Sequence, residues 1–256
     1  MHITQVRNAT LIVEYAGVKF LIDPMLADKG SFPAFVRTAN ELPNPLVHLP
    51  MSIDAIIDVD AVIVTHLHKD HWDEKAEEVI PKAKPLFAQN IEDASYLEGR
   101  GFTNVDVLSS SSVFSGVSLV KVRGQHGSDD VMNQLRDRLG HVCGVVFKHP
   151  DEDVLYIAGD TVWNDYVSSN LDEHQPKVVV LNAGDARINN AGPIIMGVED
   201  VNNVALKAPY ASIFATHLEA VNHAMLSRQE LWEFAVQNGF SDRISIPQDG
   251  ECITFS

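Results

Sequence analysis

The stretch Thr65-His66-Leu67-His68-Lys69-Asp70-His71-Trp72 carries four potential metal ligands within six positions. It follows the apolar, β-branched run 61–64, which predicts a buried strand. Alternate side chains of an extended segment share a face, so His66 and His68 can point at one ion. If the chain then turns into a helix with Asp70 and His71 in its first turn, those two are directed towards a second ion. Imidazole with carboxylate suits zinc, manganese or iron rather than calcium. A polar loop that merely holds three histidines is the weaker interpretation, given this ligand density.

The pattern His66-x-His68-x-Asp70-His71 after an apolar strand resembles the signature of the metallo-β-lactamase fold superfamily. The resemblance implies a third histidine for the first metal site, an aspartate that bridges both ions and a last histidine for the second site. Each should follow a strand. The sequence offers candidates in this order, each after a strand-like run: His126, Asp160 and His217.

The resemblance assigns His66, His68 and His126 to the first ion. The second ion takes Asp70, His71 and His217, and Asp160 bridges the pair. We expect two divalent ions, zinc or manganese, although a single ion is an open alternative. Two such ions together with two carboxylates and a hydroxide give the site a net positive charge. This charge lowers the pKa of bound water, so that hydroxide exists at neutral pH. Asp160 and Asp70 are the predicted catalytic residues, with Asp70 also orienting the attacking hydroxide.

The bulk composition predicts one folded domain over residues 1–256. The chain has 256 residues, 45% of them hydrophobic, which allows a large core. Its formal charge is −16, from 35 acidic and 19 basic residues, and this argues against nucleic acid or an anionic membrane as partner. No leader and no long apolar run is visible, which predicts a soluble, cytoplasmic protein with a small-molecule substrate. A homo-oligomer is compatible with these features. Cys143 and Cys252 are expected to be small buried hydrophobes rather than a disulfide.

Strand patterns cluster in the first and last parts of the chain, with helical patterns between them. By itself this gives a mixed α/β domain. The resemblance adds a four-layer αββα sandwich, two mixed sheets face to face with helices outside. Residues 25–55 lose periodicity and are interpreted as a partly ordered flap over the metal site. Asp23, just before them, either supports a ligand histidine or caps a turn. Residues 128–142 are expected to be a solvated loop or short helix, and a helix is expected from about 161 to 171.

The resemblance is strongest to the compact branch of metal-dependent hydrolases that includes L-ascorbate-6-phosphate lactonases, although the turn at residues 7–10 departs from that branch. It implies a metal-dependent hydrolase that uses a metal-bound hydroxide on a small ester, lactone or phosphodiester. The alternative is a metal-binding protein of the same fold without turnover, regulatory or redox.

Four further residues near the ligand segments are candidate substrate contacts. Arg187 could hold an anionic group through its planar guanidinium, or could form a surface salt bridge. Trp163 could line a pocket or fill the core. His223 could shuttle protons or be a surface histidine, and Asp185 completes the set.

Overall fold

The computed structural model describes residues 1–255 and contains two large sheets. The first has the order β16-β1-β2-β3-β4-β5-β6. Its strands are β1 (His2–Arg7), β2 (Thr10–Tyr15), β3 (Val18–Ile22), β4 (Ala61–Val64), β5 (Leu86–Ala88), β6 (Val105–Val107) and β16 (Cys252–Thr254). The meander β1-β2-β3 and the β16 edge are antiparallel, whereas β3 to β6 run parallel.

The second sheet has the order β15-β14-β11-β10-β9-β8-β7. Its strands are β7 (Ser112–Phe114), β8 (Val117–Arg123), β9 (Cys143–His149), β10 (Glu152–Ile157), β11 (Val178–Asn182), β14 (Ser212–Thr216) and β15 (Ile244–Ser245). Strands β7 to β10 are antiparallel, and β10, β11, β14 and β15 are parallel. A small ribbon, β12 (Arg187–Ile188) with β13 (Gly192–Pro193), stands apart from both sheets.

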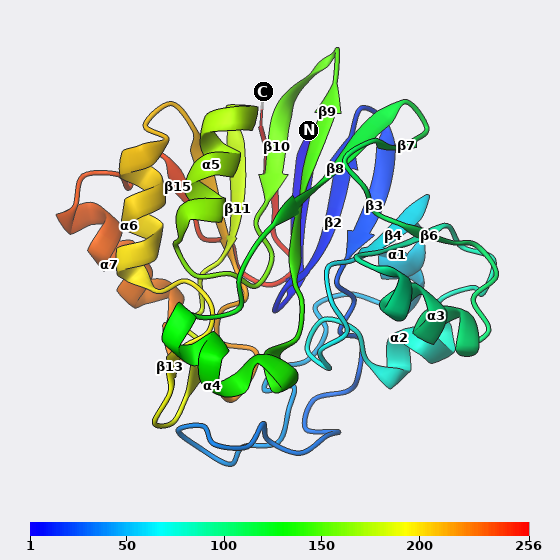
Figure 1. The fold of residues 1–256 in the computed structure, drawn as a ribbon, viewed down its shortest axis with the longest axis horizontal. Coiled ribbons are helices and arrows are strands. Elements are labelled where there is room, and N and C mark those ends of the chain that lie inside the picture. The colour runs from blue at the N-terminus through cyan, green and yellow to red at the C-terminus, as the bar shows by residue number, and fades with distance from the viewer. Residues whose placement is uncertain (256) are drawn as a thin grey trace.

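Helices cover the outer face of each sheet, which confirms the predicted αββα sandwich (Figure 1). On the first sheet lie α1 (Ile53–Ile57), α2 (Glu74–Val79) and α3 (Ile91–Gly99). On the second lie α5 (Asp165–His174), α6 (Val198–Lys207) and α7 (Arg228–Gln237). The remaining helix, α4 (Asp129–Leu139), lies across the end of the sandwich where the strands of both sheets stop (Figure 1).

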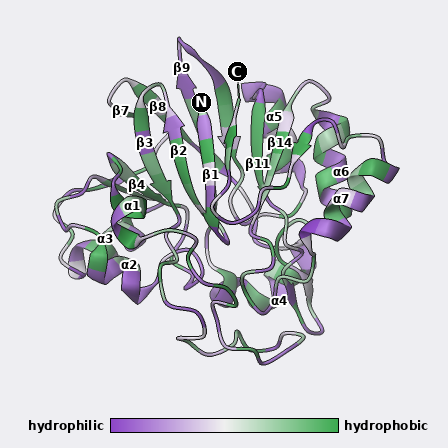
Figure 2. Cartoon of the chain, turned by 180° about the vertical axis from the view of Figure 1, so that it is seen from behind, coloured by the Kyte–Doolittle hydropathy of each residue, from purple (hydrophilic) through white to green (hydrophobic). Residues whose placement is uncertain are grey.

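Three apolar layers hold the sandwich together, and the side-chain alternation of the strands decides which residue enters which layer. In β11, Val178 and Val180 face the layer between the sheets, while Val179 and Leu181 face the helices. A strand buried on both faces reads as a continuous apolar run, as this one does. Figure 2 shows the central strands largely apolar and the outer helices banded with polar residues. Within residues 1–255, no helix combines the length and apolar character needed to cross a bilayer.

Several local predictions need correction. Asp70 and His71 do not lie in a helix: the amides of His71 and Trp72 both bond to the His68 carbonyl, which makes a single turn. Helix α2 begins only after Asp73, whose side chain caps it by accepting from the Ala76 amide.

Two other predictions were wrong in position or burial. Helix α5 starts at Asp165 rather than near 161, because Asn164 caps it. Cys252 is exposed, since its strand is an edge strand, whereas Cys143 is buried as predicted; both are free cysteines.

Residues 24–52 form a long loop with no helix and only an isolated bridge between Phe32 and Asn44. The fully buried Arg7 ties this loop to the first sheet by donating to the carbonyls of Met25, Ala27 and Val47. The loop therefore has a defined course past the end of the sandwich, where α4 also lies (Figure 1).

Candidate metal centre and adjoining cavity

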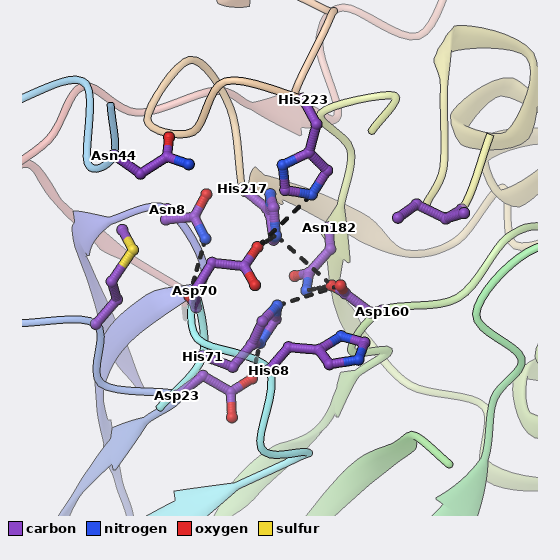
Figure 3. Close-up of polar contacts among 12 residues, drawn as sticks. Asn8, Asp23, Asn44, His68, Asp70, His71, Asp160, Asn182, His217 and His223 are labelled. Carbon is purple, nitrogen blue, oxygen red and sulfur yellow. Dashed lines mark hydrogen bonds and ion pairs between the residues drawn. The ribbon is translucent and has the colours of Figure 1, made fainter. Parts of the chain in front are cut away.

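The predicted ligands converge at the end of the sandwich because the segments that carry them all leave the sheets at that edge. Parallel strands deliver their carboxyl ends to one edge. The segment with His66 to His71 follows β4, Asp160 follows β10 and His217 follows β14. His126 follows β8, which runs in the same direction as β10 because both are antiparallel to β9. Figure 3 shows several of these side chains pointing toward one another.

All seven predicted ligands belong to compact groups of donor atoms, each within 4.8 Å of one another. The structure forms three such groups: His66 with His68 and His126, His66 with His71 and Asp160, and Asp70 with His71 and His217. The first and third match the two predicted sites. Asp160 lies between them, with Oδ2 3.4 Å from His126 Nε2 and 3.2 Å from His71 Nε2, and Oδ1 3.8 Å from His217 Nε2.

Buried donors without hydrogen-bond partners show that this cluster suits a cation. The atoms Asp70 Oδ2, His71 Nε2 and His217 Nε2 are buried and lack a partner among the described residues. Unpartnered buried polar atoms are costly, and such atoms need an ion or water to satisfy them. Imidazole nitrogens and carboxylate oxygens are the donors that zinc and manganese accept, so the residues present fit the expected ions.

The protonation of the histidines agrees with this fit. Burial lowers the pKa of His66 well below its usual value, and the neighbouring His71 lowers it further, so His66 offers a lone pair. Burial also lowers the pKa of His126, to about 4. Burial alone would lower the pKa of His71, but the Asp160 and Asp23 carboxylates hold it well above its usual value. A divalent cation between His71 and Asp160 would take the place of that proton.

Asp23 supports His71 from behind, which settles the open question about its role. Its Oδ2 lies 2.9 Å from His71 Nδ1, and its two oxygens also accept from the Thr65 amide and hydroxyl at 2.7 Å. A carboxylate only accepts, so Nδ1 carries a proton towards Asp23. A cation that displaced the second proton, at Nε2, would find the lone pair of that nitrogen facing Asp160. Asp23 and His217 both adopt left-handed backbone, with φ of 45° and 61°. Such strain in non-glycine residues is typical of functional sites.

Asp160 and Asp70 are held in the ionised form. Burial alone would raise the pKa of each, but the histidines around them hold both well below the usual range. Asn182 fixes the Asp160 carboxylate by donating to Oδ1 at 2.6 Å, and Asn8 fixes the turn at Asp70 by donating to its carbonyl (Figure 3). Neither asparagine was singled out in the sequence. Asn182 follows the same rule as the ligands, a polar residue at the end of a buried strand, and that signal would have found it.

A cavity of about 230 Å³ adjoins the cluster on the side of Asp70, Asp160 and His223. Its wall is mostly apolar, and its remaining lining comes from Phe35, Thr38, His68, His126, Arg138, Leu139, Ile188 and Ile194. The long loop contributes Phe35 and Thr38, so part of the predicted flap, residues 25–55, lines the cavity at the site. Residues 53–55 were wrongly included in it, since they begin α1. A larger groove of about 980 Å³, open and polar, reaches His66, His68 and His126 from the other side.

The four predicted substrate contacts have different positions. His223 lines the cavity, with Nε2 3.8 Å from Asp70 Oδ2. Arg187 is 53% exposed, pairs with Asp185 at 2.8 Å and does not line the cavity. Trp163 lines a separate surface pocket and packs partly against the helix layer of the second sheet. Arg138 is the guanidinium at the cavity, and the sequence had placed it only in a charged, solvated segment.

The comparisons with known proteins agree with this geometry. Residues 19–218 match the family model described as a beta-lactamase superfamily domain. The chain is 52% identical over 257 residues to the UPF0173 protein YddR of Bacillus subtilis, with full coverage of both sequences.

Two solved structures superpose over the whole chain. The isothiocyanate hydrolase from Delia radicum gut bacteria has a TM-score of 0.97 and 46% identity, and covers 100% of this chain and 99% of its own. A possible metal-dependent hydrolase from Veillonella parvula has the same TM-score and the same coverage, with 38% identity. The chain therefore belongs to the β-lactamase superfamily with the metallo-β-lactamase fold, and within it to a family of metal-dependent hydrolases.

Proposed function

We propose that this protein hydrolyses small, mainly apolar electrophiles in the cavity beside Asp70 and His223. Isothiocyanates are the substrate class with the strongest support. The observation that carries the proposal is the cavity itself. Its volume of about 230 Å³ is below the roughly 300–1,000 Å³ of pockets for drug-sized ligands, so it suits a small molecule. The similarity to an isothiocyanate hydrolase supports this substrate class independently.

The predicted ligands are proposed to hold two divalent ions, zinc or manganese, divided between the two sites as the resemblance implies. Bound there, the ions would make water more acidic and stabilise negative charge that develops on the substrate. The protein's own groups then have distinct tasks. Asn182 and Asp23 fix the orientations of Asp160 and His71, and the apolar wall shields the reacting carbon from competing solvent.

The reaction needs a proton to move from water to the substrate nitrogen. Water adds its oxygen to the central carbon of R–N=C=S, and one of its protons ends on the nitrogen, giving a thiocarbamic acid. This acid then breaks down to a primary amine and carbonyl sulfide. Asp70 and His223 both line the cavity, and Asp70 Oδ2 lies 3.8 Å from His223 Nε2. Burial lowers the pKa of His223 to about 4, so its neutral ring at the cavity wall can carry this proton to the nitrogen, while the ionised Asp70 orients the attacking water.

Small esters and lactones, predicted from the sequence, are the second class that this cavity supports, since they also offer an electrophilic carbon of similar size. A phosphodiester has less support, because Arg138 is the one arginine or lysine in the cavity lining and its guanidinium already donates to the Val36 carbonyl. A binding protein without turnover is less favoured, because Asp70 and His223 face a cavity that can admit a substrate.

The test combines elemental analysis with a substrate panel. Purified protein is assayed with methyl and benzyl isothiocyanate, a phenyl ester, a lactone and a phosphodiester, with added zinc or manganese and after chelation. We expect about two ions per chain, metal-dependent loss of isothiocyanate and release of amine. Arg187→Ala serves as a control and should leave the rates unchanged, since Arg187 lies outside the cavity lining. Faster hydrolysis of the phosphodiester than of either isothiocyanate would overturn the proposal.

A further inference from the structure

A single buried asparagine joins the loop that lines the cavity to the loop that carries His223. Asn222 is 1% exposed and lies at the centre of contacts with residues 35–44, which we call the Phe35 loop. Its Oδ1 accepts from the Phe35 amide at 2.9 Å and from Asn44 Nδ2 at 2.8 Å. Its Nδ2 donates to Thr38 Oγ1 at 2.7 Å, to the Asn40 carbonyl at 3.0 Å and to the Phe35 carbonyl at 3.3 Å.

The backbone of Asn222 is engaged with the same loop. Its amide donates to Asn44 Oδ1 at 2.8 Å, and its carbonyl accepts from Asn40 Nδ2 at 3.0 Å. An amide side chain has two protons and two acceptor lone pairs, so every polar group of Asn222 is occupied. These hydrogen bonds join Asn222 to residues 35–44, about 180 positions earlier in the chain.

The residues held in this way form part of the wall of the reaction cavity. Phe35 and Thr38 line it, and the Phe35 ring meets the His223 ring edge-on with 4.7 Å between centroids. Asn222 and His223 are neighbours with different partners, the first bonded to the Phe35 loop and the second facing Asp70. A shift of the Phe35 loop would therefore change the cavity wall and the packing of His223 together.

The other attachments of the Phe35 loop are more exposed. The Asn189 amide donates to the Arg37 carbonyl, and the Arg37 guanidinium donates back to the Asn189 carbonyl. The Asn189 side chain donates to the Thr38 carbonyl, and Arg138 donates to the Val36 carbonyl. Asn189 and Arg138 are both exposed, so water competes for these bonds. The buried backbone pair of Phe32 and Asn44 joins the Phe35 loop only to the preceding part of the same long loop. Asn222 is the buried side chain that joins it to the segment with His223.

We infer that Asn222 is a positioning residue that sets the selectivity for the apolar part of the substrate, by fixing Phe35 and Thr38 against His223. The inference rests on the proposed function. A substrate with a large apolar group needs the ordered wall, whereas the smallest substrate contacts little of it. Misplacement of the wall by about 1 Å is enough to cost up to about a hundredfold in rate.

The experiment compares methyl with benzyl isothiocyanate in the metal-loaded protein and its Asn222→Ala variant. We expect kcat/KM for the benzyl substrate to fall about tenfold or more, mainly through KM, and that for the methyl substrate to change by less than about twofold. Metal content should stay the same. Hydrogen exchange should be faster at residues 35–40, because the Phe35 amide loses its acceptor. An equal loss on both substrates, or none on either, would overturn the inference.

Two further variants guard against a general loss of folding. Asn222→Asp keeps the acceptor contacts with Phe35 and Asn44 but loses the donor contacts, so its selectivity should lie between those of the wild type and Asn222→Ala. Asn170→Ala is the matched control, since Asn170 is a buried asparagine on α5, outside the cavity lining, that donates to the Arg123 carbonyl and the Tyr156 hydroxyl. It should lower stability and leave the ratio of the two substrates unchanged.

The outcome also separates this inference from the proposed function. If the wild-type protein hydrolyses neither isothiocyanate, the proposed function fails and the selectivity role fails with it. The exchange rates of residues 35–40 in Asn222→Ala still decide whether Asn222 holds the loop. If the wild type hydrolyses both and Asn222→Ala keeps their ratio, the function stands and the inference fails.

Discussion

Replacing Asp23 by asparagine should weaken metal binding by changing which nitrogen of His71 carries a proton. The carboxylate accepts from His71 Nδ1 at 2.9 Å and from both the amide and the hydroxyl of Thr65. In Asp23→Asn, the amide oxygen Oδ1 can still accept from the Thr65 amide, so the amide nitrogen Nδ2 takes the place of the carboxylate oxygen that faced Thr65 Oγ1 and His71 Nδ1. The Thr65 hydroxyl can turn and accept from Nδ2. At His71, however, Nδ2–H would face Nδ1–H, and this repulsion is relieved only if Nδ1 loses its proton.

The neutral ring can do this by moving the proton to Nε2, which lies 3.2 Å from Asp160 Oδ2. The nitrogen that should bind a metal would then carry hydrogen. Loss of such a supporting carboxylate lowers metal affinity by about 10- to 100-fold, or about 1.4 to 2.7 kcal/mol. The metal-free fold should lose less, about 1 kcal/mol, because most of the hydrogen bonds around residue 23 can be re-formed.

The measurement is competition for zinc between the protein and a chromophoric chelator, alongside thermal unfolding of the metal-free protein. Asp73→Asn is the matched control, because Asp73 is also a buried aspartate but accepts from the amides of Ala27 and Ala76 and touches no histidine. Its zinc affinity should equal that of the wild type. An affinity for Asp23→Asn within about twofold of the wild type would refute the reasoning about the His71 tautomer.

Three further changes test other parts of the site. Asp160→Ala should abolish hydrolysis and lower the metal content while the far-UV circular dichroism spectrum is kept; loss of the spectrum would indicate a structural role instead. Gly184→Ala should lower the free energy of unfolding in urea by about 1 to 3 kcal/mol, because a Cβ there would overlap the His217 carbonyl oxygen. A wild-type midpoint would contradict this close approach. Arg7→Met should lower the free energy of unfolding by about 3 kcal/mol in the same assay, since the buried Met25 carbonyl and the partly buried Ala27 and Val47 carbonyls lose a charged donor. The long loop should then become sensitive to protease. Unchanged protease resistance would show that Arg7 does not hold the loop.

The sequence predicted those parts of the site that depend on local order along the chain. A buried strand followed at once by histidine or aspartate is visible without any knowledge of distant contacts, and the resemblance supplied the order of the ligands. The structure brings together every residue chosen in this way, from His66 to His217. The strand and helix patterns by themselves predicted only a mixed α/β domain. The αββα layers came from the resemblance, and the structure confirms them.

The features that were missed depend on contacts between distant segments. Nothing near Phe35 or Asn222 in the sequence indicates that they meet across 187 positions. Arg187 was the preferred anion contact because its planar guanidinium lies near the ligand segments in the sequence. It forms the alternative salt bridge, with Asp185, and Arg138 lies at the cavity instead. The expected helix at His71 was wrong because the chain makes one turn before Asp73 can cap α2.

The origin of the ligands has a consequence for how the protein unfolds. Four of the ligands follow a strand of the first sheet, namely His66, His68, Asp70 and His71. The other three follow strands of the second sheet, namely His126, Asp160 and His217. Each of the three donor groups contains residues from both sheets and therefore closes only when the two halves of the sandwich have docked. Bound ions would act as clamps between the halves and add about 2.7 kcal/mol of stability at a free metal concentration 100 times the dissociation constant. Removal of the metal would then lower the stability of the whole fold as well as abolish hydrolysis.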